Sequence, residues 1–178
     1  IRKRHVATDE TTTSLCTQVA KRLLKKSGTD PAELSYVIVA TMSSDYQTPS
    51  TAALVQSAVG AKNAAAFDIS AACSGFAYGI KILSALLDQR LGSKGILIGG
   101  ETLTKYVNWR DRSTAVLFGD GAGGILATSS GPGKIIATDL KTYGNLGLKL
   151  RAGHFGYQDP YYHRSDPAVF STCQHEAP

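Results

Sequence analysis

A cysteine, Cys73, lies at the centre of the segment FDISAACSGFAYGI, residues 67–80. An apolar run typical of a buried strand precedes it, and apolar residues at helical spacing follow it. The first turn of a helix offers unpaired N–H groups and the positive end of the helix dipole, which together stabilise a thiolate. The small neighbours Ala71, Ala72 and Gly75 leave room for an approaching substrate. These residues leave two interpretations open: a nucleophile, or a small buried core residue.

The other two cysteines are Cys16 and Cys173. An odd number of cysteines at wide spacing argues against a disulfide framework and favours a reducing compartment. Cys16 falls near the apolar stripe of a predicted helix, which favours core packing. Cys173 and His175, with His163 upstream, match no zinc-site spacing, so we expect no metal.

The composition, 43% hydrophobic and 19% charged over 178 residues, is typical of a globular protein with its own core. No apolar run approaches the ~18 residues of a membrane helix, and the start IRKRHVATDE lacks the apolar stretch of a signal peptide. Because the first residue is not Met, we expect a fragment or a processed product. The net charge of +5 accompanies no nucleic-acid-binding motif. We therefore expect a cytoplasmic protein with neither membrane nor nucleic-acid partners.

Helices and strands are predicted to alternate through the first hundred or so residues. The predicted elements are a helix capped within residues 8–13 and ended by Gly28, a strand at 36–42, a helix from Ser50 or Thr51 to Gly60, a strand at 64–70, a helix at 74–90 and a strand at 95–102. This alternation predicts an α/β layer with a largely parallel sheet.

After residue 110 the pattern changes. The segment STAVLFGDGAGGILATSS, residues 113–130, predicts two strands around a glycine-rich turn, and KIIATDL, residues 134–140, predicts another strand. The glycines at 119–124 have formal G-x-G-x-x-G spacing, but a strand-like segment follows where a dinucleotide site needs a helix. We therefore expect a tight turn there rather than a nucleotide site. Residues 149–178 show no clear period and predict a loop or tail.

Several segments together resemble the β-ketoacyl-acyl-carrier-protein synthase III family, the enzymes that start type II fatty acid synthesis. In order and spacing, the segments are IRKRH, VIVATMSSDYQTPSTAALVQSAVGA, DISAACSGFAYGI and DRSTAVLFGDGAGG. The resemblance implies an α/β, thiolase-like fold, with this chain an incomplete N-terminal half of a five-layered α-β-α-β-α sandwich. It divides the chain into a partial half-domain at 1–148 and an unassigned loop or tail at 149–178.

The resemblance also implies a reaction, a decarboxylative Claisen condensation of a short acyl-CoA with malonyl-acyl-carrier protein through a thioester on Cys73. Arg112 matches an arginine near the coenzyme A adenine and phosphates; the alternative is a surface ion pair with Asp111 or another acid. Coenzyme A thioester is then a substrate, with no permanently bound cofactor. A homodimer through the edge strand at 63–70 is implied too, with Thr48 reaching toward the partner's acyl pocket.

The sequence departs from the family in its condensation residues. Segments like HQAN and GNTSAAS, which carry the family's His and Asn, are absent, as is the glycine of the second oxyanion donor. The four histidines match neither motif; they are His5, His154, His163 and His175. The alternatives are therefore a condensation-incompetent fragment that only dimerises or holds an acyl group, and a polyketide-priming relative.

Overall fold

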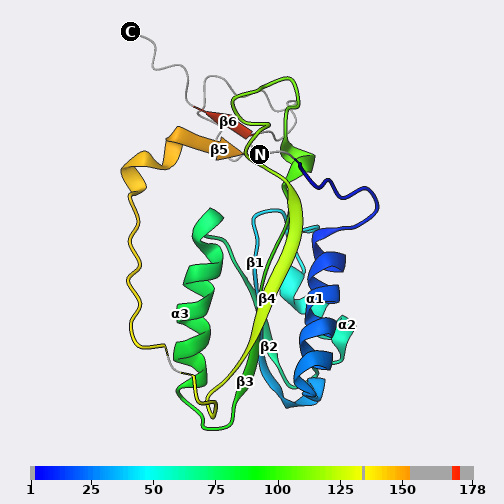
Figure 1. Ribbon diagram of the computed structural model, residues 1–178, viewed down its shortest axis with the longest axis vertical. Coiled ribbons are helices and arrows are strands. Elements are labelled where there is room, and N and C mark those ends of the chain that lie inside the picture. The colour runs from blue at the N-terminus through cyan, green and yellow to red at the C-terminus, as the bar shows by residue number, and fades with distance from the viewer. Residues whose placement is uncertain (1–2, 134, 153–169, 173–178) are drawn as a thin grey trace.

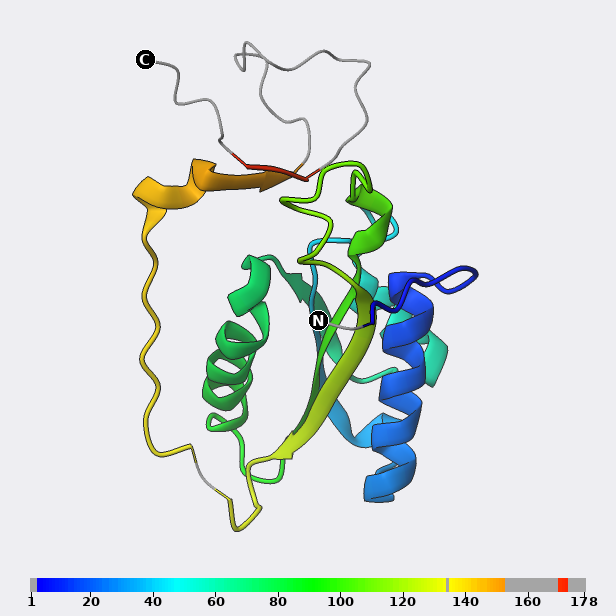
Figure 2. The same ribbon diagram turned by 45° about the horizontal axis from the view of Figure 1, so that its top comes forward.

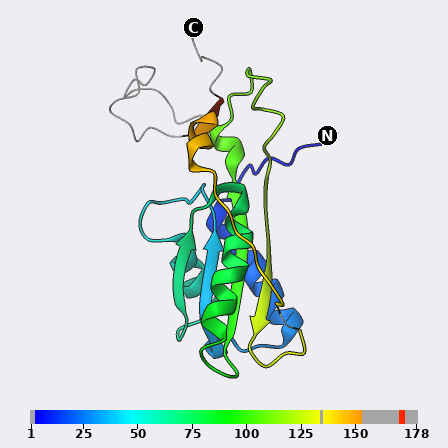
Figure 3. The same cartoon turned by 90° about the vertical axis from the view of Figure 1, so that its left-hand side faces the viewer.

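The structure, a computed structural model, describes residues 3–133, 135–152 and 170–172. A central sheet lies between α1 and α2 on one face and α3 on the other (Figure 1). Figure 3 looks onto α3, with the sheet behind it. In chain order the elements are α1 (Thr12–Ser27), η1 (Pro31–Glu33), β1 (Leu34–Ala40), α2 (Thr51–Val59), β2 (Ala65–Ile69), η2 (Ala72–Ser74), α3 (Gly75–Leu87), β3 (Lys94–Thr102), η3 (Leu103–Tyr106), β4 (Asp120–Thr128), η4 (Gly144–Lys149), β5 (Leu150–Ala152) and β6 (Phe170–Thr172), where η marks a 3-10 helix.

Within the described residues, the main sheet has four strands in the order β2-β1-β3-β4. The first three are parallel, with Ile38 of β1 paired to Phe67 of β2 and to Leu97 of β3. β4 runs antiparallel to β3 and forms the edge of the sheet opposite β2. The predicted alternation of helices and strands and the largely parallel sheet are thus confirmed.

The ends of α1 follow the signals in the sequence. Thr11 and Ser14 form a reciprocal capping box, in which each side chain accepts a hydrogen bond from the other residue's N–H. Gly28 ends the helix at φ 65°, a left-handed conformation that costs glycine little. Lys25 and Lys26 lie in the last turn, where the helix dipole favours positive charge.

Two aspartates from outside the helices provide a second N-terminal cap, one for α1 and one for α2. Asp45 accepts hydrogen bonds from the first two N–H groups of α1, at 3.1 and 2.9 Å. Asp68, on β2, accepts from the first two N–H groups of α2, both at 2.7 Å. Because a carboxylate at a helix start satisfies unpaired donors and the dipole together, these contacts fix α1 to the loop after β1 and α2 to β2.

Among the described residues, the hydrophobic core has one cluster on each side of the sheet and a third, smaller one at Val107 and Phe118. Between the sheet and the first two helices lie Cys16, Ala20, Leu24, Leu34, Val37, Val39, Ala52, Val55, Ala61, Ile96 and Ile98. Between the sheet and α3 lie Ile38, Leu83, Leu87 and Leu97. The alternating side chains of β1 and β3 therefore divide between the two faces, and both strands are largely buried.

The prediction of two strands around a glycine-rich turn at 113–130 is wrong for the first strand and the turn, while its second strand is part of β4 (Asp120–Thr128). Residues 113–117 form turns, and Gly121, Gly123 and Gly124 belong to one continuous strand, β4. Asp111 holds the turns by accepting hydrogen bonds from Ser113 and Thr114. Gly124 is glycine because a Cβ there would lie 2.6 Å from the carbonyl oxygen of Leu97 on the paired strand. Gly124 is thus required by the close approach of the neighbouring strand and not by a turn.

The predicted strand at 134–140 is also wrong over its described residues, 135–140, which have no regular secondary structure. This segment runs beside α3 instead of joining the sheet (Figure 2). The Tyr78 hydroxyl of α3 and the Thr142 hydroxyl lie 2.6 Å apart and tie the end of the segment to the helix. An apolar run without a neighbouring strand cannot form ladder hydrogen bonds, and Ile136 is 95% exposed.

Beyond this segment, η4 leads into β5, which pairs antiparallel with β6. Most of the stretch predicted as a loop or tail, 149–178, lies outside the described residues. The division of the chain at residue 148 therefore stays a prediction.

Candidate active site

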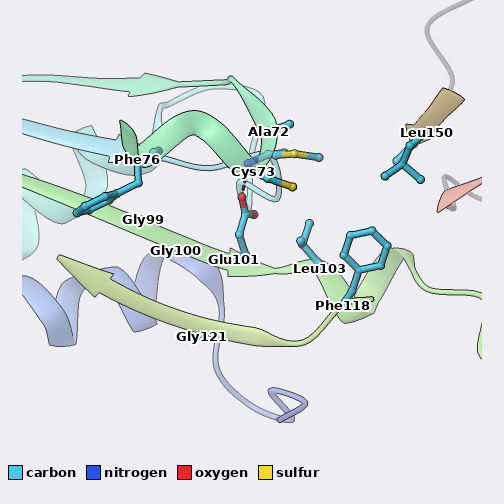
Figure 4. A pocket seen from close by; sticks show the side chains of 13 residues that line it. Ala72, Cys73, Phe76, Gly99, Gly100, Glu101, Leu103, Phe118, Gly121 and Leu150 are labelled. Carbon is cyan, nitrogen blue, oxygen red and sulfur yellow. Dashed lines mark hydrogen bonds between the residues drawn. The ribbon is translucent and has the colours of Figure 1, made fainter. Parts of the chain in front are cut away.

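A pocket of about 280 Å³ lies where β1, β2 and β3 end (Figure 4). Carboxyl ends of parallel strands are where open α/β sheets bind ligands. The walls are mostly apolar, and β5 contributes to them from far along the chain. The lining residues are Ala40, Met42, Ala72, Cys73, Phe76, Gly99, Gly100, Glu101, Leu103, Phe118, Gly121, Leu150 and Ala152.

Cys73 lies in this pocket as a free, exposed thiol. It belongs to η2, which joins the end of β2 to α3, so the predicted strand-to-helix corner is confirmed. Ala72 adopts φ 46°, a left-handed conformation that is rare outside glycine and sharpens the turn before the sulfur. The alternative of a buried core residue does not apply to Cys73.

The helix start behind Cys73 differs from those of α1 and α2. No side chain of a described residue caps either η2 or α3, whereas Thr11 and Ser50 cap the other two helices. The N–H groups of Ser74 and Gly75 there donate to the backbone carbonyls of Ala71 and Ala72 rather than to a capping side chain. Such a helix start favours a thiolate or a developing oxyanion.

Cys16 has the opposite environment. It is fully buried between α1 and the sheet, as the sequence predicted. Burial, with smaller contributions from the charges of Asp68, Glu101 and Asp45, raises its pKa from 9.0 to about 12. Cys16 is thus an inert thiol at neutral pH. Cys173 lies outside the described residues.

Glu101, near the end of β3, is a pocket residue that the sequence analysis missed. Its carboxylate accepts hydrogen bonds from the Met42 N–H at 2.9 Å, from the Thr41 hydroxyl at 3.1 Å and from the Ser43 hydroxyl. The signal was its position at the carboxyl end of a predicted parallel strand, the edge of the sheet where Cys73 was already expected.

Arg112, the other predicted site residue, lies in the turns at 109–117 and is exposed. Arg112 is not among the residues that line the pocket, so the structure does not bring the two predicted site residues, Cys73 and Arg112, together in it. The carboxylate of Asp111 accepts hydrogen bonds from the side chains of Ser113 and Thr114. These bonds lower the pKa of Asp111, and the bond from Ser113 has the largest effect. Asp111 is thus engaged by its own turn.

Two other kinds of site find no support within the described ranges. No cluster of three or more His, Cys, Asp or Glu side chains there could hold a metal ion. No helix among those residues is both long and apolar enough to cross a membrane.

The comparisons with known proteins agree with one another on what this chain resembles. The family described as 3-oxoacyl-[acyl-carrier-protein (ACP)] synthase III matches residues 67–144. A relative from Levilactobacillus brevis, named beta-ketoacyl-[acyl-carrier-protein] synthase III, is 50% identical over 169 residues, which cover 94% of this chain and 51% of the relative.

Solved structures agree with the sequence relatives. The crystal structure of 3-oxoacyl-[acyl-carrier-protein] synthase III from Aquifex aeolicus has a TM-score of 0.82 at 43% identity, covering 88% of this chain and 51% of that one. The priming β-ketosynthase of the R1128 polyketide pathway has a TM-score of 0.78 at 31% identity, covering 97% and 52%. The chain is therefore similar to 3-oxoacyl-[acyl-carrier-protein] synthase III proteins, has part of their thiolase-like α/β fold, and spans about half the length of the relatives it matches.

Proposed function

We propose that this chain is the nucleophile-bearing part of a β-ketoacyl-acyl-carrier-protein synthase III. The reaction is the decarboxylative Claisen condensation of a short acyl-CoA with malonyl-acyl-carrier protein, which initiates fatty acid biosynthesis. The observation that carries the proposal is the exposed Cys73 thiol at an uncapped helix start, inside a mostly apolar pocket. We place the enzyme in the cytoplasm, with coenzyme A thioester as a substrate and no permanently bound cofactor.

The first half of the reaction uses Cys73. Its sulfur attacks the thioester carbon of acyl-CoA, and the carbonyl oxygen becomes an oxyanion near the start of α3. When the intermediate collapses, the bond to the coenzyme A sulfur breaks and that sulfur takes up the proton lost by Cys73. The acyl group is then held as a thioester among the apolar side chains of Phe76, Leu103 and Phe118.

The second half forms the new carbon–carbon bond. Malonyl thioester loses carbon dioxide to give an enolate, whose carbon attacks the acyl carbonyl and releases Cys73 as a thiolate. Negative charge gathers on the thioester oxygen, and each lost donor for such an oxygen costs roughly 100- to 1000-fold in rate. The described lining residues include neither His nor Asn. We therefore assign those donors to other parts of the complete protein.

Arg112 is proposed to bind the phosphates of coenzyme A, because an exposed guanidinium suits phosphate geometry. Arg112→Ala should raise KM for acyl-CoA by about 10-fold or more, since charged hydrogen bonds are lost. The neighbouring Arg110 is also exposed, and Arg110→Ala is the matched control. Equal KM values in the two variants would remove this role from Arg112.

We also propose a homodimer in which β2 pairs with its symmetry mate. β2 is an edge strand in the described sheet, and Ala65 and Ala66 give it a narrow surface that a second strand can approach. An uncovered edge would be open to aggregation. Thr48, exposed in the loop before α2, would then face the partner. Light scattering of the complete protein at micromolar concentration tests this, and a stable monomer would reject it.

A second candidate is the priming of polyketide synthesis, favoured by the match to the R1128 priming β-ketosynthase. Both candidates share an acyl thioester on Cys73 and differ in the acyl group and carrier protein. Turnover with the carrier proteins of fatty acid and of polyketide synthesis, measured side by side, distinguishes them.

The principal test is acylation of the complete protein by acetyl-CoA, followed by intact-mass measurement and peptide mapping. We expect one acetyl group on Cys73, none in Cys73→Ala, and β-ketoacyl product when radiolabelled acetyl-CoA and malonyl-acyl-carrier protein are supplied. Residues 1–178 alone should acylate slowly at most and give no product. Acetylation at another residue, or turnover by Cys73→Ala, would overturn the proposal.

A further inference from the structure

Glu101 is the one charged residue among the described residues that line the Cys73 pocket. Figure 4 shows its carboxylate beneath the turn that carries Ala72 and Cys73. The other lining side chains are apolar or small apart from the sulfur of Cys73 itself. A single fixed charge in such a pocket acts on whatever is bound there, because apolar walls screen charge poorly.

The contacts of Glu101 are those of an ionised carboxylate. Three donors reach it: the Met42 N–H and the hydroxyls of Thr41 and Ser43. A protonated carboxyl group would itself need an acceptor, whereas an ionised one only accepts. Glu101 therefore holds its negative charge through bonds to the segment that follows β1.

The same contacts hold the charge in place. Beyond its bond to Glu101, the Ser43 hydroxyl accepts a hydrogen bond from the Thr102 N–H at 2.8 Å, and the Thr12 hydroxyl donates to the Ser43 carbonyl at 2.7 Å. The Lys105 ammonium donates to that carbonyl as well, at 2.9 Å. Since strand, helix and loop all converge on Ser43, Glu101 cannot swing away from the pocket without breaking several bonds.

We propose that Glu101 selects the acyl group loaded on Cys73 by repelling acyl chains that carry a carboxylate. This inference rests on the proposed thioester at Cys73. A neutral acyl chain meets only the carbon walls, but a dicarboxylic acyl chain, such as malonyl or succinyl, places a second negative charge near a fixed one. Like charges juxtaposed at a binding site disfavour the wrong ligand strongly, a form of selection by repulsion.

Such a filter answers a chemical need of the condensation. The two substrates are both thioesters, and only the one without a carboxylate should reach the nucleophile first. The other must stay on its carrier until it loses carbon dioxide. A pocket that rejects the carboxylate keeps Cys73 from being blocked by a malonyl group.

The test compares succinyl-CoA with pentanoyl-CoA, a neutral acyl thioester of similar length, on the complete protein. The rate of thioester formation on Cys73 is followed by mass spectrometry. Glu101→Gln keeps the size of the side chain and removes its charge, so the succinyl-to-pentanoyl rate ratio should rise by about 10-fold or more. The pentanoyl rate should change much less. Glu33→Gln is the matched control: Glu33 pairs with Lys94 at the other end of β3, and its loss should leave the ratio unchanged.

A second measurement needs no change to the protein. Wild-type protein should load monomethyl succinyl-CoA, in which the carboxylate is esterified, at least about 10-fold faster than succinyl-CoA. Equal rates for these two thioesters, or an unchanged ratio in a folded Glu101→Gln variant, would overturn the filter while leaving the proposed function intact. Absence of any thioester on Cys73, even from neutral acyl-CoA, would overturn both.

Discussion

The sulfur of Cys16 occupies the space that a side chain at Gly100 would need. Cys16 is on α1 and Gly100 on β3, and Gly100 also lines the Cys73 pocket. The glycine lets the helix pack against the strand at the place where the strand forms the pocket. Gly100 thus lines the pocket and also contacts the core cluster that contains Cys16.

Gly100→Ala should therefore destabilise the protein by about 1–3 kcal/mol, because overpacking forces the helix or the strand to move. Chemical denaturation of the complete protein measures the loss. Gly123→Ala on β4 is the matched control, since a Cβ there meets no atom of the described residues within 4 Å. Equal stabilities of the two variants would show that α1 yields without cost.

Brief alkylation near neutral pH should label Cys73 well before Cys16. The first sulfur is exposed at a helix start, while burial raises the pKa of the second to about 12. Peptide mapping by mass spectrometry reads out the labelled sites. Denatured protein, in which Cys16 becomes reactive, is the control. Preferential labelling of Cys16 or Cys173 in folded protein would contradict this prediction.

Asp45 should contribute stability that disappears in acid. Burial acts to raise its pKa, but the hydrogen bonds from Thr13, Thr11 and Thr12 outweigh it and hold the pKa below 3.8. The stabilisation is therefore full above pH 3.8 and is lost as the pH falls through the lower folded-state value.

Asp45→Ala should cost about 1 kcal/mol at pH 7, the usual effect of removing a helix cap. The difference from wild type should shrink as the pH falls below 4. Denaturation across this range measures it, with the exposed Asp9→Ala as the control. A difference that stays constant down to pH 2 would count against the charged cap.

Ala72 sets the turn before Cys73, so its substitutions should separate backbone strain from side-chain loss. Ala72→Gly fits φ 46° without strain and should change stability by about 1 kcal/mol or less. Ala72→Val should cost about 1–3 kcal/mol and slow alkylation of Cys73, because a β-branched residue resists this conformation. Denaturation and alkylation rates are the measurements. Wild-type behaviour of Ala72→Val would mean that the turn has another conformation in solution.

The elements that could be predicted from the sequence are those whose ends are encoded locally. Gly28 and Gly60 end α1 and α2 in left-handed conformations, and Ser50 caps α2, as their positions in the sequence indicate. The corner at Cys73 was also predictable, since strand-like and helix-like periods meet there.

The failures share a cause, which is that distant neighbours decide them. The glycines of β4 resemble a turn in isolation, but Gly124 is needed because Leu97 approaches from the paired strand. Residues 135–140 resemble a strand, yet they lie along α3 and not beside a strand. The place of Glu101 in the pocket depends on β3 ending next to Cys73, which the local sequence does not indicate.

The caps of α1 and α2 have a consequence for the order of folding during synthesis. Asp45 is 33 residues beyond its hydrogen-bond partner at the start of α1, and Asp68 is 17 beyond its partner in α2. Each carboxylate leaves the ribosome after the helix that it stabilises. The first N–H groups of α1 and α2 therefore lack these carboxylate acceptors until later segments of the nascent chain have been made. Both helices are then fully capped only once these distant contacts form, and contacts between distant parts of a chain make folding slower.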